Sequence, residues 1–360
     1  MKYIDEYRNP DLVGKLADKI AATVSRQWHI MEICGGQTHA IMKYNLPELL
    51  PPEISLIHGP GCPVCVTPME KIDRALAIAY SEKTILTSFG DMMRVPGSES
   101  DLLRARAEGC DIRIVYSPLD AVEIAISNPD MNVVFFAIGF ETTAPANALA
   151  LLKAESMNLS NFFLLASPVL VPPAINALMS SEDTAIDGLL APGHVCAVTG
   201  YDDYIRLSDK FKIPIAITGF EPVDILKGIL ATVSMLENGL VELTNSYRRS
   251  VRREGNTRAL QTMYEVFEIC DREWRGIGLI PDSGLSIKEK YSTFDAEKQF
   301  DLRQTIRHNP GLCIAGAVLS GRSRPSECPA FSTSCTPEHP LGAPMVSSEG
   351  ACAAYYKYRS

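Results

Sequence analysis

Two groups of cysteines are the residues of this chain whose types and spacing could do chemistry. Cys34, Cys62 and Cys65 lie near the N-terminus, and Cys62 and Cys65 form a CxxC pair in a turn of glycine and proline. Such a pair is typical of thiol redox sites and of metal sites. The second group closes the chain: Cys313, Cys328, Cys335 and Cys352. Both groups in one chain indicate iron and thiol chemistry.

The tail cysteines have the spacing C-x14-C-x6-C-x16-C, which matches no common ferredoxin pattern. The segment around them is rich in proline and glycine and has little apolar sequence with which to build a core. Four thiolates around an iron–sulfur cluster would order it, and a zinc ion held by the same thiolates is the alternative. Cys110 and Cys270 have no such surroundings and are interpreted as packing residues, whereas Cys196 stays undecided.

The N-terminal cysteines follow two predicted strands, 29–33 and 54–58. In doubly wound sheets, ligands bind beyond the carboxyl ends of strands, so we expect these thiols to share one cleft. A nearby helix N-terminus is expected to lower their pKa. Cys34 taken alone could equally be a small buried hydrophobe. Only His39 and His58 lie nearby in the sequence, which favours an open metal position or a redox pair over a four-ligand zinc site.

Titratable residues also follow other predicted strands, each beside a glycine. Glu141 and Glu221 either cap helices or act at the site, and the repetition of the pattern favours function. His194 is either a structural histidine or a proton-transfer group beside Cys196. With His39, these residues are candidates to position ligands or relay protons.

Composition restricts the class of protein. The 360 residues carry 34 lysines and arginines against 43 aspartates and glutamates, a net charge of -9, which argues against nucleic-acid binding. No apolar stretch is long enough to span a bilayer, and no secretion signal is visible. We therefore expect a cytoplasmic protein in a reducing compartment, where clustered cysteines bind metal or do redox work.

Short apolar runs alternate with helical patterns, which predicts an α/β fold with parallel sheets. We expect two doubly wound domains facing a cleft, at 29–130 and 131–244. A third, loop-rich domain at 245–360 would hold the cluster, with the N-terminal helix within 1–28 packed on it. Further helices are predicted at Tyr247–Arg258 and Leu260–Arg275. The predicted strands are His29–Ile33, Ile54–His58, Thr84–Phe89, Ile112–Tyr116, Val133–Ile138, Phe162–Ala166 and Ile213–Thr218.

Several strings together resemble the hydrogenase formation protein HypD family. They are MEICGGQTHAI, HGPGCPVCVTP, FGDMMRVPGS, IGFETTAP, GHVCAVTG, GFEPVDIL, WRGIG and CTPEHPLGAPMVSSEGACAAYYKY, from Met31 to Tyr358. The resemblance implies a scaffold for the Fe(CN)2CO centre of nickel–iron hydrogenases. It also implies a [4Fe-4S] cluster in the third domain, cleft thiols at Cys34, Cys62 and Cys65, and two partners, the small chaperone HypC and the cyanide-supplying HypE.

We therefore expect iron bound by Cys34, Cys65 or both, shared with a cysteine of HypC, while the tail cysteines hold the cluster. Such a protein would be an assembly scaffold with redox activity rather than a turnover enzyme. Two alternatives remain: a cluster-dependent protein disulfide reductase and a zinc-stabilised binding module. The CxxC pair lacks the thioredoxin-type setting expected of the reductase.

Overall fold

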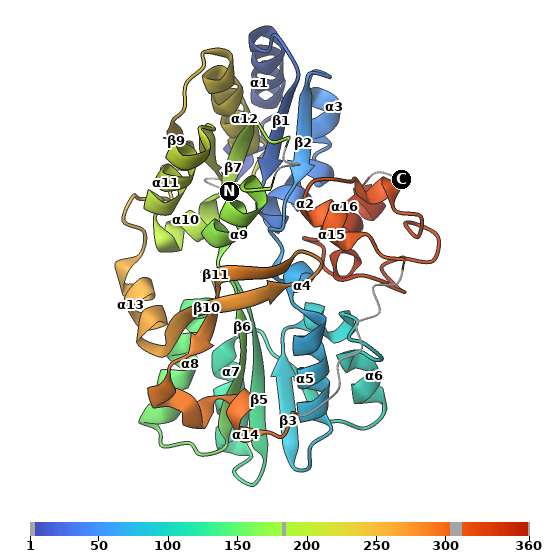
Figure 1. Ribbon diagram of the computed structural model, residues 1–360, viewed down its shortest axis with the longest axis vertical. Coiled ribbons are helices and arrows are strands. Elements are labelled where there is room, and N and C mark those ends of the chain that lie inside the picture. Colours follow the sequence, from blue (N-terminus) through green and yellow to red (C-terminus); the bar gives the residue numbers. More distant parts are fainter. Residues whose placement is uncertain (1–3, 182–184, 303–311, 359–360) are drawn as a thin grey trace.

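The computed structural model describes residues 4–181, 185–302 and 312–358, and it contains two parallel sheets in two lobes of an elongated molecule (Figure 1). The five-stranded lobe has the strand order β2-β1-β7-β8-β9. Its strands are β1 (Trp28–Glu32), β2 (Ile54–His58), β7 (Gly188–Pro192), β8 (Ile215–Thr218) and β9 (Leu243–Asn245). Every neighbouring pair in this sheet is parallel.

The four-stranded lobe has the order β4-β3-β5-β6, again with parallel neighbours only. Its strands are β3 (Thr84–Ser88), β4 (Ile112–Ile114), β5 (Asn132–Gly139) and β6 (Phe162–Pro168). β3 and β6 are buried along their whole length, as parallel strands covered by helices on both faces are. The predicted α/β class with doubly wound-like parallel sheets is thereby confirmed.

Helices cover both sheets. The five-stranded lobe carries η1 (Asp5–Tyr7), α1 (Pro10–Thr23), α2 (Gly35–Lys43), α3 (Leu46–Leu49), α10 (Gly193–Thr199), α11 (Asp202–Phe211) and α12 (Pro222–Glu237). The four-stranded lobe carries α5 (Met69–Ala79), η2 (Gly90–Arg94), α6 (Leu102–Ala107), α7 (Pro118–Ser127) and α8 (Ala144–Ser156). Two further helices, α4 (Pro63–Val66) and α9 (Val171–Met179), lie where the chain crosses between the lobes.

The lobes do not divide where the sequence predicted. β5 begins at Asn132 and pairs with β3, so the predicted boundary near residue 130 falls inside one sheet. The five-stranded lobe combines residues 28–58 with 188–245, because β1 pairs with β7. Chain order alone does not reveal which strands pair, and β7 was not predicted at all. The expected domains 29–130 and 131–244 are therefore wrong as continuous units.

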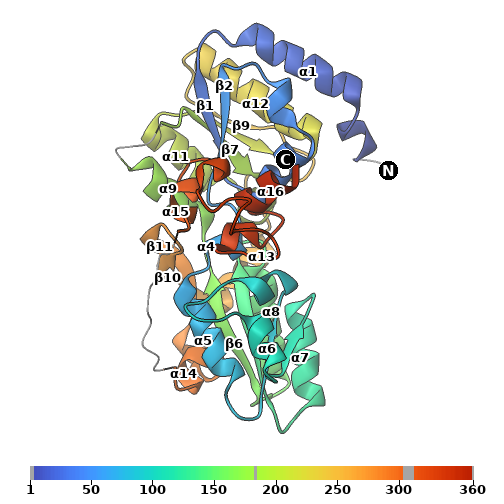
Figure 2. The same cartoon turned by 90° about the vertical axis from the view of Figure 1, so that its right-hand side faces the viewer.

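The N-terminal helix also differs from expectation. α1 packs along α12 at the far end of the five-stranded lobe (Figure 2), with Leu16 and Ile20 in the same apolar cluster as Ile229 and Val233. Pro10 begins this helix and Asn9 caps it by accepting the Leu12 N–H. The prediction that α1 packs on a C-terminal domain is corrected accordingly.

The expected third domain at 245–360 is not confirmed as one unit. α13 (Thr257–Val266) packs on α8, and the antiparallel hairpin β10 (Phe267–Trp274) and β11 (Gly278–Ile287) packs on β6 and α9. η3 (Glu289–Phe294) and α14 (Ala296–Gln299) also contact β6. The helices predicted at 247–258 and 260–275 are wrong, except for the part that α13 occupies.

Only the segment 312–358, here called the tail, is loop-rich as expected. It contains α15 (Ala315–Leu319), η4 (Pro325–Glu327), η5 (Ala343–Met345) and α16 (Ala351–Tyr358). Its small core is formed by Ala330, Cys335, Met345 and Ala353, and α16 packs on α2 (Figure 1). Among the described residues, no helix is long and apolar enough to cross a membrane.

Candidate functional site

Cys34 lies at the carboxyl end of β1, where it precedes the first turn of α2. The neighbouring parallel strand β7 ends at the same edge and leads into α10, which brings His194 to that edge. The Cys34 Sγ is 3.7 Å from His194 Nδ1, and the thiol side chain is buried. The sequence predicted both residues for the site, and the structure brings them together.

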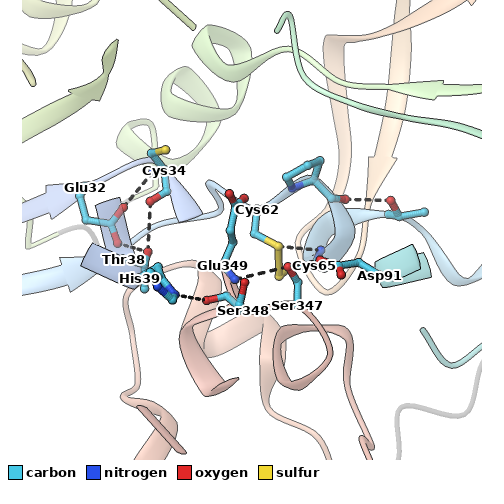
Figure 3. Close-up of a disulfide and its surroundings, with 12 residues drawn as sticks. Glu32, Cys34, Thr38, His39, Cys62, Cys65, Asp91, Ser347, Ser348 and Glu349 are labelled. Atoms are coloured by element: carbon cyan, nitrogen blue, oxygen red, sulfur yellow. Dashed lines mark hydrogen bonds between the residues drawn. A yellow bond between two sulfur atoms is a disulfide. The ribbon is translucent and has the colours of Figure 1, made fainter. Parts of the chain in front are cut away.

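A buried carboxylate that the sequence did not predict holds the Cys34 loop. Glu32 Oε2 accepts the Cys34 N–H at 2.8 Å, and Glu32 Oε1 accepts from the Thr38 hydroxyl (Figure 3). Glu32 Oε1 also accepts from His58 Nδ1 at 2.7 Å. Glu32 is the last residue of β1 and is fully buried. A buried charge requires such partners. The sequence feature that could have indicated this role is an acidic residue within an apolar, strand-like run.

The CxxC loop lies directly against the Cys34 loop. Cys62 and Cys65 are joined by a disulfide, and Cys62 caps the short helix α4. Gly35 donates its N–H to the Gly61 carbonyl at 2.7 Å, and a Cβ on Gly61 would stand 2.1 Å from the Cys34 nitrogen. Only glycine permits this approach. The three cysteines predicted for the cleft thus come from two loops in direct contact (Figure 3).

The expected low pKa of Cys34 is wrong. Backbone N–H groups of Gly36 and Gln37, at the start of α2, do favour the thiolate. Burial is the larger effect, however, and the carboxylates of Glu32 and Glu349 add to it, so the pKa of Cys34 lies well above its usual value. Cys34 is therefore a protonated thiol at neutral pH.

His194 is a neutral imidazole at physiological pH. Burial lowers its pKa to about 4, because the charged ring would lose its hydration. Its ring meets Phe220 edge to face, with centroids 5.2 Å apart. A neutral ring keeps one nitrogen lone pair, so His194 can accept a hydrogen bond beside Cys34.

The tail covers this site through short contacts around Glu349. The Ser347 hydroxyl donates to Asp91 Oδ2 at 2.7 Å, and His39 Nδ1 lies 3.0 Å from the Ser348 carbonyl (Figure 3). A Cβ on Gly35 would meet the Glu349 side chain at 2.6 Å. His39, predicted as a catalytic residue, thus faces the tail backbone.

The four tail cysteines are electrostatic neighbours. Burial is the largest cause of the raised pKa of Cys352. Electrostatic repulsion from three other thiols raises it further, in the order Cys313, Cys335 and Cys328. A Cβ on Gly342 would stand 2.4 Å from the Cys313 sulfur, so glycine leaves room beside that thiol. The Leu341 N–H donates to the Cys335 sulfur at 3.4 Å, the kind of hydrogen bond that protein-bound clusters receive.

The WRGIG string connects the two cysteine groups. The Arg275 N–H donates to the Val66 carbonyl of α4 at 2.9 Å, and the Arg275 guanidinium interacts favourably with Cys313. Gly276 and Gly316 pack backbone to backbone, since a Cβ on Gly316 would stand 2.0 Å from the Gly276 carbonyl oxygen. Arg275 was not predicted as a site residue, although the string was part of the resemblance. Arg275 thus places a cationic side chain between α4, the helix of the CxxC pair, and the tail.

Two predicted residues lie elsewhere. Glu221 forms an ion pair with Arg8, whose Nη2 donates to Glu221 Oε1 at 2.8 Å, so this carboxylate fixes the N-terminal segment. Glu141 belongs to a second buried group between the lobes, where Cys196 and Tyr204 are its electrostatic neighbours. Cys196 is buried, which raises its pKa and makes it a poor nucleophile.

Glu141 gives a stability prediction with a definite sign. Burial raises its pKa from 4.5 to about 7. The unfolded state therefore loses this proton at lower pH than the folded state does, and stability falls as the pH rises from about 4.5 to about 7. Glutamine does not titrate, so Glu141→Gln should escape this loss. Between about pH 5 and about pH 8, the unfolding free energy of the variant should rise by about 2–3 kcal/mol relative to that of wild type. Urea unfolding at both pH values measures this difference, and a pH-independent difference would refute it.

The fold and the site define a class of protein: a two-lobed α/β chain in which a buried thiol, a CxxC pair and a four-cysteine tail are held together by contacts among their loops. The family model described as the HypD, hydrogenase formation hypA family matches residues 11–359. The chain therefore belongs to the HypD family of hydrogenase maturation factors.

Similar proteins extend over the whole chain. The hydrogenase maturation factor HypD of Rhizobium leguminosarum bv. viciae is 45% identical over 368 residues, which cover 99% of this chain and 96% of that protein. The factor of the same name from Escherichia coli (strain K12) is 44% identical, over 100% of this chain and 98% of the relative. The hydrogenase maturation factor HypD of Cupriavidus necator is also 44% identical, and the match covers 99% of this chain and 97% of that protein.

Proposed function

We propose that this chain holds an iron ion at Cys34 while cyanide and carbon monoxide ligands are added to it, as a scaffold for the Fe(CN)2CO centre of nickel–iron hydrogenase. The observation that supports this best is the electrostatic setting of Cys34. Two carboxylates, Glu32 and Glu349, oppose its bare thiolate, whereas a bound cation would be stabilised by the same charges. Thiolate is a soft donor that suits such iron.

His194 is the second group at this iron site. It lies 3.7 Å from the Cys34 sulfur and stays neutral because it is buried. The Cys34 proton is released when iron binds, and the neutral imidazole can accept a hydrogen bond from an incoming ligand. Of the predicted relay residues, His194 has the geometry for this role, while Glu141 and Glu221 lie in other contacts.

Cys62 and Cys65 supply a reversible two-electron couple beside Cys34. Reduction of their disulfide takes up two electrons and two protons and yields two thiols. Cys65 can bind iron only in the reduced state, because both sulfurs are committed to the disulfide in this structure. We propose that the oxidation state of this pair decides whether Cys65 joins Cys34 as an iron ligand.

The tail cysteines fit a [4Fe-4S] cluster. All four interact electrostatically, Gly342 lies against the Cys313 sulfur where a side chain would clash, and the Leu341 N–H donates to the Cys335 sulfur. No group of three or more His, Cys, Asp or Glu side chains in the described part of the chain is close enough for a single metal ion. A zinc ion held by the same four thiolates is the alternative, which metal and sulfide analysis separates from the cluster. When bound, the cluster would supply single electrons.

Two partners complete the proposed function. HypC would share the iron through its N-terminal cysteine, and HypE would supply cyanide. Because Cys34 is only 2% exposed, docking of HypC must move the covering segment around Glu349 or the His194 turn. The charge of -9 gives no reason to expect nucleic acid among the partners.

A protein disulfide reductase is the second candidate, favoured by the disulfide-bonded CxxC pair near the tail cysteines. Cys62 and Cys65 are 2% and 0% exposed, however, and a substrate disulfide must reach the attacking sulfur. A reductase would therefore require the covering segment to open wide enough to admit a protein disulfide.

Metal analysis of the anaerobically purified chain separates these functions from a zinc-binding module. We expect about four iron and four acid-labile sulfide per chain, with further iron when HypC is co-purified. One zinc per chain without sulfide would reject the cluster and the scaffold together. Rapid turnover of a generic protein disulfide without HypC would favour the reductase.

A further inference from the structure

A large cavity lies between the two lobes, away from the cysteine site. Its volume is about 740 Å³, and its walls come from α9, α11, α13 and the hairpin β10–β11. Pro172, Leu207, Leu260 and Ile280 supply apolar surface. Cavities of this size, mainly apolar and located between domains, are where proteins bind small molecules.

Glu141 is a buried polar group that lines the cavity. Its side chain is 2% exposed, and its Oε1 accepts the Val171 N–H at 2.9 Å. Its Oε2 is buried without a hydrogen-bond partner among the described residues, although Glu141 lines the cavity. A buried carboxylate oxygen without a donor is unfavourable, so a ligand that donates to it gains that hydrogen bond.

The charges around the cavity favour a positive ligand. Asp203 also lines the cavity and opposes the ionisation of Glu141, adding to the effect of burial on its pKa. Asp282 is a third acidic residue of the lining, against two basic ones, Arg206 and Lys210. Arg206 donates to the Asp203 carboxylate, and Lys210 donates to Asn176 Oδ1 at 2.5 Å. A bound cation would relieve the repulsion between the Glu141 and Asp203 carboxyl groups.

We propose that this cavity binds a small organic cation, whose ammonium or amidinium N–H donates to Glu141 Oε2 and whose apolar body packs on Pro172, Leu207 and Leu260. The half-exposed ring of Tyr264 at the rim adds an aromatic face on which such a cation can pack. The site requires neither the iron nor the tail cysteines, so it can be tested independently of the proposed scaffold function.

Benzylamine, which is a cation at neutral pH, is a suitable probe. Benzyl alcohol has nearly the same shape but no charge, so it serves as the neutral control ligand. Ligand-observed NMR titration of the full chain, purified anaerobically, measures both affinities. We expect saturable benzylamine binding in the millimolar range and weaker binding of benzyl alcohol. Glu141→Gln keeps the side-chain shape but removes the charge, so it should weaken benzylamine about tenfold and leave benzyl alcohol unchanged.

Two further variants make the test specific. Ala177→Phe fills the cavity from the partly exposed face of α9 and should abolish binding of both probes. Glu123→Gln removes an exposed carboxylate on α7, outside the cavity, and should change neither affinity. Equal benzylamine affinity of wild type and Glu141→Gln would overturn the proposal, as would the absence of saturable benzylamine binding to wild type.

Discussion

Replacement of Cys34 by serine is expected to remove the iron held between this chain and HypC while the fold persists. The two side chains have nearly the same shape, and the Cys34 loop is also held by backbone contacts that do not need the sulfur: Cys34 N–H to Glu32 Oε2 and Gly35 N–H to the Gly61 carbonyl. A serine hydroxyl does not ionise at neutral pH and is a poor donor to soft iron. We expect retention of this iron to fall more than about 100-fold. Iron counts and Mössbauer spectra of the anaerobically co-purified complex measure the loss.

Cys110→Ser is the matched control, since Cys110 is a free, partly buried cysteine of the four-stranded lobe. Its complex should keep the full iron signal. The Cys65→Ser complex should also lose iron signal, because we propose that reduced Cys65 joins Cys34 as an iron ligand. If Cys34→Ser and Cys65→Ser both kept the signal, the assignment of the iron site would be rejected.

Replacement of Cys335 by serine is expected to have the second large effect, on the cluster and on the order of the tail. Cys335 lies in the small tail core with Ala330, Met345 and Ala353, and this core is too small to order a proline-rich segment alone. Metal binding can contribute on the order of 10 kcal/mol to the folding of such segments. We expect iron and sulfide to fall from about four per chain towards zero and the tail to become sensitive to protease.

Cys270→Ser is the control for this prediction. Cys270 lies on the hairpin strand β10, where Arg272 contacts its sulfur at 3.4 Å, and its loss should leave the cluster intact. A Cys335→Ser protein with a full complement of iron and sulfide would show that the cluster uses another ligand set.

The strands were largely predictable from the sequence, whereas their pairing was not. β2 was predicted with its observed limits, and most other predicted strands differ by a few residues at their ends. β7, β9, β10 and β11 were not predicted. β7 (Gly188–Pro192) is a short run that begins with glycine and ends with proline, and β9 has only three residues. The helix predicted at 260–275 failed because α13 passes into β10 at Phe267 with no glycine or proline between them.

The site was predictable in its cysteines but not in its electrostatics. Cys34, His194 and the CxxC pair were predicted as site residues because of their positions near glycines in loops that follow apolar, strand-like runs, and parallel strands end at one edge of a sheet. The pKa of Cys34 was predicted in the wrong direction because burial, which outweighs the helix N-terminus, depends on tertiary packing. Glu32 and Arg275 were missed for the same reason: their roles arise from contacts with distant segments.

Infrared spectroscopy of the chain purified anaerobically with HypC tests the iron scaffold most directly, because bound cyanide and carbon monoxide absorb where proteins do not. We predict bands of both ligands from the wild-type and Cys110→Ser complexes and none from the Cys34→Ser complex. Cyanide and carbon monoxide bands of undiminished intensity in the Cys34→Ser complex would contradict the proposal that Cys34 holds the iron.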